Sequence, residues 1–106
     1  MTMKKLRHKF NAKAVTKNFI RYDSKLEAKL ATKLDFMKRE GEVLFYLRQV
    51  PFDLPGGVKY RCDFQVFYSN GEVEFIDAKG IETEVFKIKK KILEEMYPIK
   101  LIIWKG

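Results

Sequence analysis

Two aspartates and a lysine, residue types that can handle a metal-bound water, stand close together in the second half of the chain. Asp63 precedes a turn at Asn70-Gly71, and Asp77 and Lys79 follow it. Since a strand points residues two apart toward one face, Asp77 and Lys79 share a face. Two carboxylates that meet across a hairpin suit a hard cation such as Mg²⁺ or Mn²⁺, and a nearby lysine can orient an attacking water. The combination favours phosphodiester hydrolysis, and the alternative is a cross-strand salt bridge.

The length of the hairpin loop decides whether the two carboxylates meet. A two-residue Asn70-Gly71 turn would place Asp63 and Asp77 on opposite faces of the sheet. A three-residue loop, 69–71, with Gly71 in a left-handed bulge position, would place Asp63 directly opposite Asp77. We therefore predict the three-residue loop.

A helix precedes these strands and carries a third carboxylate. Asp23-Ser24 opens it, apolar residues recur at helical spacing through residues 26–37, and Gly41 ends it. Ser24 and Glu27 fit a capping box. Glu27 therefore has two interpretations, a helix cap and a carboxylate that looks toward the sheet, and both stay open.

The remaining elements complete a small mixed sheet. We predict strands over residues 42–54, 58–68, 72–79 and 99–104, with breaks at Pro51 and at residues 55–57. A second helix begins at Thr83 and ends before Pro98. Its predicted apolar positions are Val85, Ile88, Ile92 and Met96. The order α-β-β-β-α-β predicts an α/β fold, a mixed β-sheet flanked by helices, in a single domain over residues 21–106.

Length and composition exclude several classes of protein. The chain has 106 residues, 46% of them hydrophobic, which fits one small globular domain. No apolar run approaches the ~20 residues that span a bilayer, so no membrane partner is expected. The only cysteine, Cys62, allows no intrachain disulfide, which favours a cytoplasmic location. One cysteine and one histidine do not supply the four ligands of a structural zinc.

The positive charge is concentrated at the N-terminus. Residues 1–40 hold twelve Lys and Arg against four Asp and Glu, whereas residues 41–106 hold ten of each sign. We interpret residues 1–20 as a basic N-terminal arm that contacts a polyanion, in preference to a solvated tail or a weakly membrane-associated one. The basic residues assigned to DNA contact in this arm are Lys4, Lys5, Arg7, Lys9, Lys13 and Lys17.

Together, these residues resemble the PD-(D/E)XK nuclease superfamily, and most of all its small phage and prophage members related to Holliday-junction resolvases. The likeness lies in residues 22–28, 60–64, 73–80 and 85–89. It implies a restriction-endonuclease-like fold. Cys62 stands where the family pattern has proline, a residue that shapes the backbone there rather than binding metal. Asp77 stands at the position where the pattern allows Asp or Glu.

The resemblance implies a role for each site residue. Asp63 and Asp77 would ligate Mg²⁺ or Mn²⁺ with help from the Ala78 carbonyl. Lys79 would position the nucleophilic water, and Glu27 would bind a second metal or orient the site. No nucleotide cofactor is expected.

The implied substrate is DNA, with four-way junctions first, in the cytoplasm of a bacterial host. Because two symmetric cuts need two copies, a homodimer is implied. Arg61 could contact DNA or pair with a carboxylate, while Lys87 and Lys90 could contact phosphate or simply face solvent. Tyr60 is expected in the core, with base stacking as the alternative. The competing functions are another nuclease role, such as flap cleavage, nicking or the cleaving subunit of a larger complex, and a non-catalytic basic module that binds nucleic acid.

Overall fold

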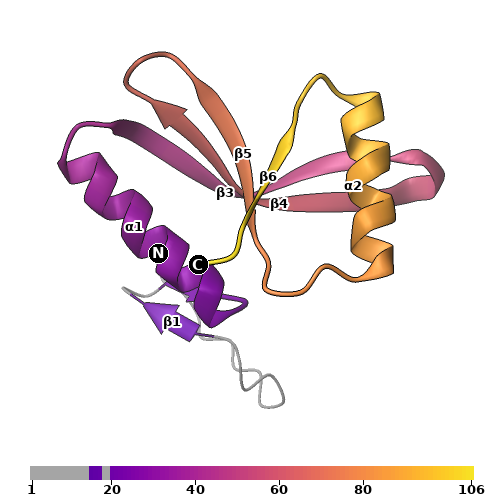
Figure 1. Ribbon diagram of the computed structural model, residues 1–106, viewed down its shortest axis with the longest axis horizontal. Helices are drawn as coiled ribbons and strands as arrows, with labels where there is room; N and C mark the ends of the chain where they lie inside the picture. Colours follow the sequence, from indigo (N-terminus) through magenta and orange to yellow (C-terminus); the bar gives the residue numbers. More distant parts are fainter. Residues whose placement is uncertain (1–14, 18–19) are drawn as a thin grey trace.

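The computed structural model describes residues 15–17 and 20–106 of the chain. The elements in chain order are β1 (Val15–Lys17), β2 (Ile20–Tyr22), α1 (Lys25–Arg39), β3 (Val43–Leu54), a 3₁₀ turn (Pro55–Gly57), β4 (Val58–Tyr68), β5 (Val73–Ala78), α2 (Glu84–Met96) and β6 (Leu101–Trp104). Strands β3–β4–β5–β6 form one four-stranded sheet in that order (Figure 1). The first three are antiparallel and β6 is parallel to β5. The predicted α/β class and the order from α1 onward are confirmed.

The two helices lie on opposite faces of this sheet. In β5, Ile76 belongs to an apolar cluster with the buried face of α1, which includes Leu30 and Leu34. Its neighbour Phe75 packs with a second cluster that contains Phe86 and Leu93 of α2. Because neighbouring strand residues point to opposite faces, the two helices cover opposite sides. Figure 1 shows them at the two ends of a strongly twisted sheet, with the centre of β4 and β5 between them.

The start of α1 carries the predicted cap. Ser24 Oγ accepts a hydrogen bond of 3.0 Å from the Glu27 N–H. Glu27 Oε1 in turn accepts from the N–H of Asp23 at 3.1 Å, one residue before the cap. The first bond satisfies an N–H group that the first helical turn leaves without a partner, and the second ties the residue before the cap to the helix. The helix ends at Arg39, with Glu40 as its C-cap, followed by Gly41 at φ +88°.

The hairpin between β4 and β5 has the predicted three-residue loop. Phe64 pairs with Ile76 and Phe67 with Val73, and the Tyr68 N–H donates to the Glu72 carbonyl at 2.9 Å. Gly71 lies in the left-handed region at φ +95°, which glycine adopts without steric cost. This register brings Asp63 level with Asp77.

Two sequence expectations about the elements are wrong. Pro51 does not break its strand, because β3 is an edge strand where a missing N–H is tolerated, and Pro51 pairs with Arg61. In α2 the buried positions are Phe86 and Leu93. Of the predicted core positions, Ile92 packs against their cluster, while Val85, Ile88 and Met96 are exposed. The outer stripe has helical spacing too, so spacing alone did not choose between the two faces.

The N-terminal strands form a separate element. Strands β1 and β2 pair with each other in a two-stranded antiparallel sheet that contacts α1. The last residues of the predicted arm, 15–17 and 20, therefore take part in this small sheet. In the part of the chain that the structure describes, no helix has the length and apolar character needed to cross a membrane.

Candidate active site

Asp63 and Asp77 lie where β4 and β5 stop pairing through their backbones. The backbone pairs end at Phe64 and Ile76. Beyond them, the Asp63 N–H donates to Asp77 Oδ1 at 2.7 Å, and the Ala78 N–H donates to Asp63 Oδ2 at 3.0 Å. Each carboxylate thus accepts a hydrogen bond from the backbone of the opposite strand. These bonds fix both side chains in the fork, the place where β4 and β5 separate.

Burial makes ionisation of this pair unfavourable. Asp77 is 2% exposed and Asp63 is half-buried. Loss of solvent raises the pKa of each carboxyl from 3.8 to about 6, and the charge of Glu27 adds to both increases. The backbone donors and the positive charge of Lys79 lower the pKa of each but do not cancel the effect. Such a pair is better stabilised by a cation than by water, because the site holds more negative charge than Lys79 offsets.

Tyr60 is a site residue that the sequence analysis assigned to the core. Its ring is 6% exposed and packs 6.3 Å from the Phe86 ring, as a core residue would. Its hydroxyl donates to Asp77 Oδ2. Alternation in β4 predicts burial at this position, but no sequence signal places the hydroxyl on a carboxylate.

Glu27 caps α1 and faces the sheet at the same time. Its side chain is 2% exposed. While Oε1 serves the helix cap, Oε2 accepts from Arg48 Nη2 and from Gln49 Nε2, each at 3.0 Å. The two interpretations that the sequence left open are therefore compatible, because the two carboxylate oxygens have different partners.

Gln49 connects Glu27 to Asp63. The same amide nitrogen that donates to Glu27 also donates to Asp63 Oδ1 at 3.3 Å. Sequence analysis did not identify Gln49 or Arg48 as site residues. The only signal available was a polar pair, Arg48-Gln49, that interrupts an otherwise apolar strand.

Lys79 lies beside the carboxylates, just beyond the end of β5. Its N–H donates to the Trp104 carbonyl at 3.0 Å, and its ammonium lies 4.8 Å from the centre of the Phe86 ring. A cation over an aromatic face is attracted by the ring quadrupole. Phe86 therefore holds the Lys79 side chain on the α2 side of the site.

The donor atoms suit a hard divalent cation, which prefers carboxylate oxygen. Asp63 and Asp77 are the pair that would hold it. Ala78 contributes its N–H to Asp63. Over residues 15–17 and 20–106, no group of three or more His, Cys, Asp or Glu side chains is arranged to hold a metal ion. Glu27 reaches Asp63 through the Gln49 amide, so direct ligation by Glu27 stays a prediction.

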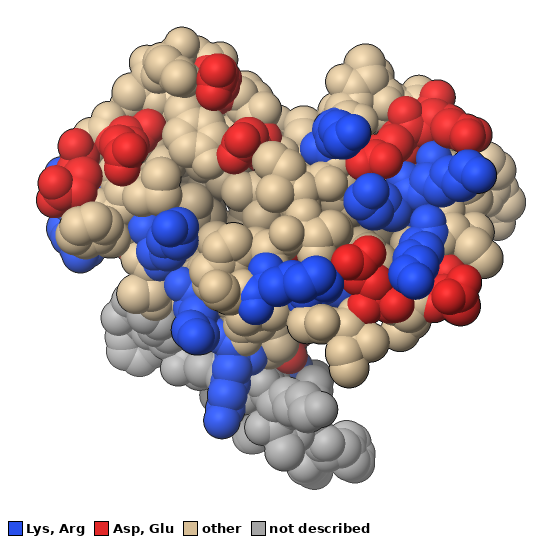
Figure 2. Space-filling view, viewed as in Figure 1, with Lys and Arg blue, Asp and Glu red and all other residues tan. Residues whose placement is uncertain are grey.

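The residues assigned to DNA contact are spread over several elements. Lys87 and Lys90 on α2 form ion pairs with Glu84 at 3.7 Å and Glu94 at 3.4 Å. Figure 2 shows basic and acidic side chains interspersed on the α2 side, so this surface is not purely basic. The side chain of Arg61 on β4 is exposed. Lys17 ends β1. The assigned residues that lie outside the described part of the chain are Lys4, Lys5, Arg7, Lys9 and Lys13.

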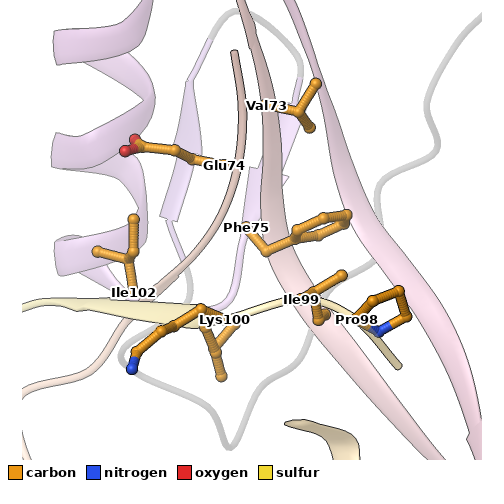
Figure 3. Close-up of a pocket in the computed structure, with 8 residues that line it drawn as sticks. Val73, Glu74, Phe75, Pro98, Ile99, Lys100 and Ile102 are labelled. Atoms are coloured by element: carbon orange, nitrogen blue, oxygen red, sulfur yellow. The ribbon is translucent and has the colours of Figure 1, made fainter. Parts of the chain in front are cut away.

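A groove of about 670 Å³ lies elsewhere, beside the starts of β5 and β6 (Figure 3). Val73, Phe75, Pro98 and Ile99 give it a mostly apolar lining. Glu27, Asp63 and Asp77 are not among the residues that line it. The candidate site is therefore the fork between β4 and β5 rather than this groove.

Comparison with known proteins gives one match. No curated protein and no solved structure matches the chain significantly. Residues 7–105 match DUF1064, a family described as a protein of unknown function. Because this match covers nearly the whole sequence, the chain belongs to the DUF1064 family.

Proposed function

We propose that the protein is a metal-dependent DNA endonuclease with a restriction-endonuclease-like fold. The observation that carries the proposal is the pair of buried Asp77 and half-buried Asp63, each bonded to the backbone of the other strand, at 2.7 and 3.0 Å, where β4 and β5 stop pairing. Lys79 lies beside this pair, two residues after Asp77. Together they supply oxygen ligands and a positive charge in one place, which hydrolysis of a phosphodiester needs.

Each residue has a role within this proposal. Asp63 and Asp77 would hold Mg²⁺ or Mn²⁺, which when bound lowers the pKa of a water and neutralises phosphate charge. Lys79 would orient the attacking water and offset the charge that develops on the phosphate. Tyr60 donates to the oxygen of Asp77 that the backbone leaves free and so keeps that carboxylate oriented. Glu27 completes the acidic side of the site through Gln49.

The proposed substrate is branched DNA, with four-way junctions as the first choice. This part of the proposal comes from the resemblance to junction resolvases and from the basic N-terminal arm. Phosphate contacts by that arm would give affinity without sequence specificity. A homodimer is part of the proposal because symmetric strand cleavage needs two sites.

The test compares a labelled immobile four-way junction with a linear duplex, each in Mg²⁺, Mn²⁺ or EDTA. Asp77→Asn serves as the inactive variant. Asp53→Asn is its matched control, because the Asp53 side chain is 80% exposed and pairs with Lys59 at the far end of β3. We expect paired cuts in the junction with wild type and with Asp53→Asn, and none in EDTA or with Asp77→Asn. Equal cleavage of both substrates would keep the nuclease and remove the junction preference.

The second candidate is a nucleic-acid-binding module without catalysis. It is favoured by the hydrogen bonds that already occupy both oxygens of Asp63 and of Asp77. In that case the carboxylates serve the structure of the fork. This function predicts junction binding that persists in EDTA and no cleavage with either metal.

A further inference from the structure

We propose that Gln49 is the positioning residue of this site, which aligns Glu27 with Asp63 by donating to both. The inference rests on the proposed nuclease function. It assigns a role to a residue that lies outside the acidic motif. Three features of Gln49 carry it: its backbone conformation, its place in the sheet and its two acceptors.

The backbone of Gln49 is in a conformation that glutamine rarely adopts. Among the described residues it is the one non-glycine residue with positive φ, at +53°. A side chain with a Cβ pays a steric cost in this left-handed region. Residues held there concentrate at functional sites, where the surrounding structure maintains them. An outlier of this kind within a strand indicates that the local geometry serves something other than the sheet.

The outlier does not shift the register of the strands. Arg48 pairs with Phe64 on one side of it, and Val50 with Cys62 on the other. Gln49 itself makes no such pair, although it lies level with Asp63. Gln49, Asp63 and Asp77 therefore stand side by side across β3, β4 and β5. A left-handed residue at this point changes the direction of one side chain and leaves the rest of the ladder in place.

The change of direction brings two consecutive side chains to one carboxylate. In a regular strand Arg48 and Gln49 would point to opposite faces. Here both donate to Glu27 Oε2, each at 3.0 Å. Arg48 supplies the charge, with its guanidinium packed 4.3 Å over the Tyr22 ring. Gln49 supplies the link to the other acids, because Arg48 makes no bond to Asp63 in the structure.

The amide of Gln49 suits this link better than a charged group would. One nitrogen with two N–H groups donates to Glu27 Oε2 and to Asp63 Oδ1. These two oxygens therefore cannot be farther apart than the sum of its two hydrogen bonds. The amide holds these two carboxyl groups near each other without adding a charge of its own, while the ion pair to Glu27 comes from Arg48.

The test measures Mn²⁺ affinity by calorimetry without DNA, beside cleavage of the junction. Gln49→Gly removes the amide and accepts the left-handed backbone. Gln49→Asn keeps the amide and tolerates this backbone, but is one methylene too short to reach both acids. Gln49→Glu keeps the shape and replaces the donor by an acceptor. The matched control is Gln65→Glu, on the neighbouring strand β4 and half-buried like Gln49.

We expect Mn²⁺ affinity and cleavage to fall about 10- to 100-fold in Gln49→Gly and Gln49→Asn, the range usual for residues that orient metal ligands. Cleavage should also fall in Gln49→Glu, because its carboxylate repels Glu27 and Asp63 where the amide held them. Gln65→Glu should match wild type in both. Gln49→Gly should unfold at a temperature no lower than wild type, because it relieves the left-handed strain. Wild-type affinity and cleavage in Gln49→Gly and Gln49→Asn would overturn this inference and leave the nuclease intact. A wild-type protein that neither binds Mn²⁺ nor cleaves would overturn both.

Discussion

Replacing Asp77 by asparagine should stabilise the fold at alkaline pH while it removes the proposed activity. Asp77 is 2% exposed, and burial raises its pKa from 3.8 to about 6. In the folded state the carboxyl therefore holds its proton to higher pH than in the unfolded state. Stability then falls as pH rises from about 4 to above 6, since the unfolded state gives up the proton first.

The size of the effect follows from this difference in pKa. One pKa unit corresponds to about 1.4 kcal/mol, so a rise from 3.8 to about 6 costs about 3 kcal/mol once the carboxyl is ionised in both states. Asparagine carries no charge, so it avoids that cost. Its amide oxygen can still accept from the Asp63 N–H, and its nitrogen can donate to the Tyr60 oxygen. We therefore expect Asp77→Asn to gain about 1 to 3 kcal/mol at pH 8 and nothing near pH 4.

The assay is urea unfolding of both proteins at pH 4, 6 and 8, in EDTA and in Mg²⁺. The free energy of unfolding of wild type should fall across this range relative to the variant. Added Mg²⁺ should restore stability to wild type at pH 8, because a ligand that binds only the folded state stabilises it by mass action. It should leave Asp77→Asn unchanged. If the variant were less stable than wild type by the same amount at pH 8 and at pH 4, the free-energy cost assigned to burial of the Asp77 charge would be refuted.

Three further predictions concern other parts of the molecule. Lys79→Ala should abolish junction cleavage and keep junction binding within a few-fold, measured by gel shift; retained cleavage would contradict its assigned role. Removing residues 1–14, which leaves β1 intact, should weaken DNA binding and flatten its salt dependence, and an unchanged slope would exclude the arm as the main phosphate contact. Phe64→Ala should lower the free energy of unfolding by about 3–5 kcal/mol, because Phe64 is 0% exposed in the α1 cluster. A loss below 1 kcal/mol would mean that this cluster tolerates a cavity.

The parts of the fold that local chemistry decides could be predicted from the sequence. The cap at Ser24 and the stop at Gly41 follow from residue types that satisfy or end a helical turn. The loop over residues 69–71 follows from the need for a left-handed glycine at Gly71, and it fixes the register of β4 and β5. Because of that register, the meeting of Asp63 and Asp77 was also predictable.

What tertiary packing decides could not be predicted in the same way. In α2, the stripe of Val85, Ile88 and Met96 and the pair Phe86 and Leu93 both have helical spacing. Only the position of the sheet selects the second face. Strand β3 continues through Pro51 because it lies at the edge of the sheet. Strand order is not a local property, so the sequence around Pro51 does not reveal it.

The site contains interactions that no local pattern encodes. The Tyr60 hydroxyl reaches Asp77 across the fork, and Gln49 reaches Glu27 from a strand distant in sequence. The left-handed conformation of Gln49 runs against the preference of its residue type. Sequence rules describe what each segment prefers, so they fail where the surrounding structure imposes something else.

Such failures are themselves informative because of where they lie. A carboxyl pair with raised pKa, a left-handed glutamine and the Arg48 Nε, which is buried without a hydrogen-bond partner, all occur around Glu27, Asp63 and Asp77. Each of these features lowers the free energy of unfolding. If they were scattered over the molecule, they would indicate only imperfect packing. Their concentration at one fork of the sheet is what a preorganised site predicts, since groups held in position for a ligand gain their full stabilisation only when it binds. If Asp77→Asn stabilises the fold, the lost free energy of unfolding comes from the charge of the carboxylates. The Gln49 variants would then measure separately how much stability is lost by holding these groups in position.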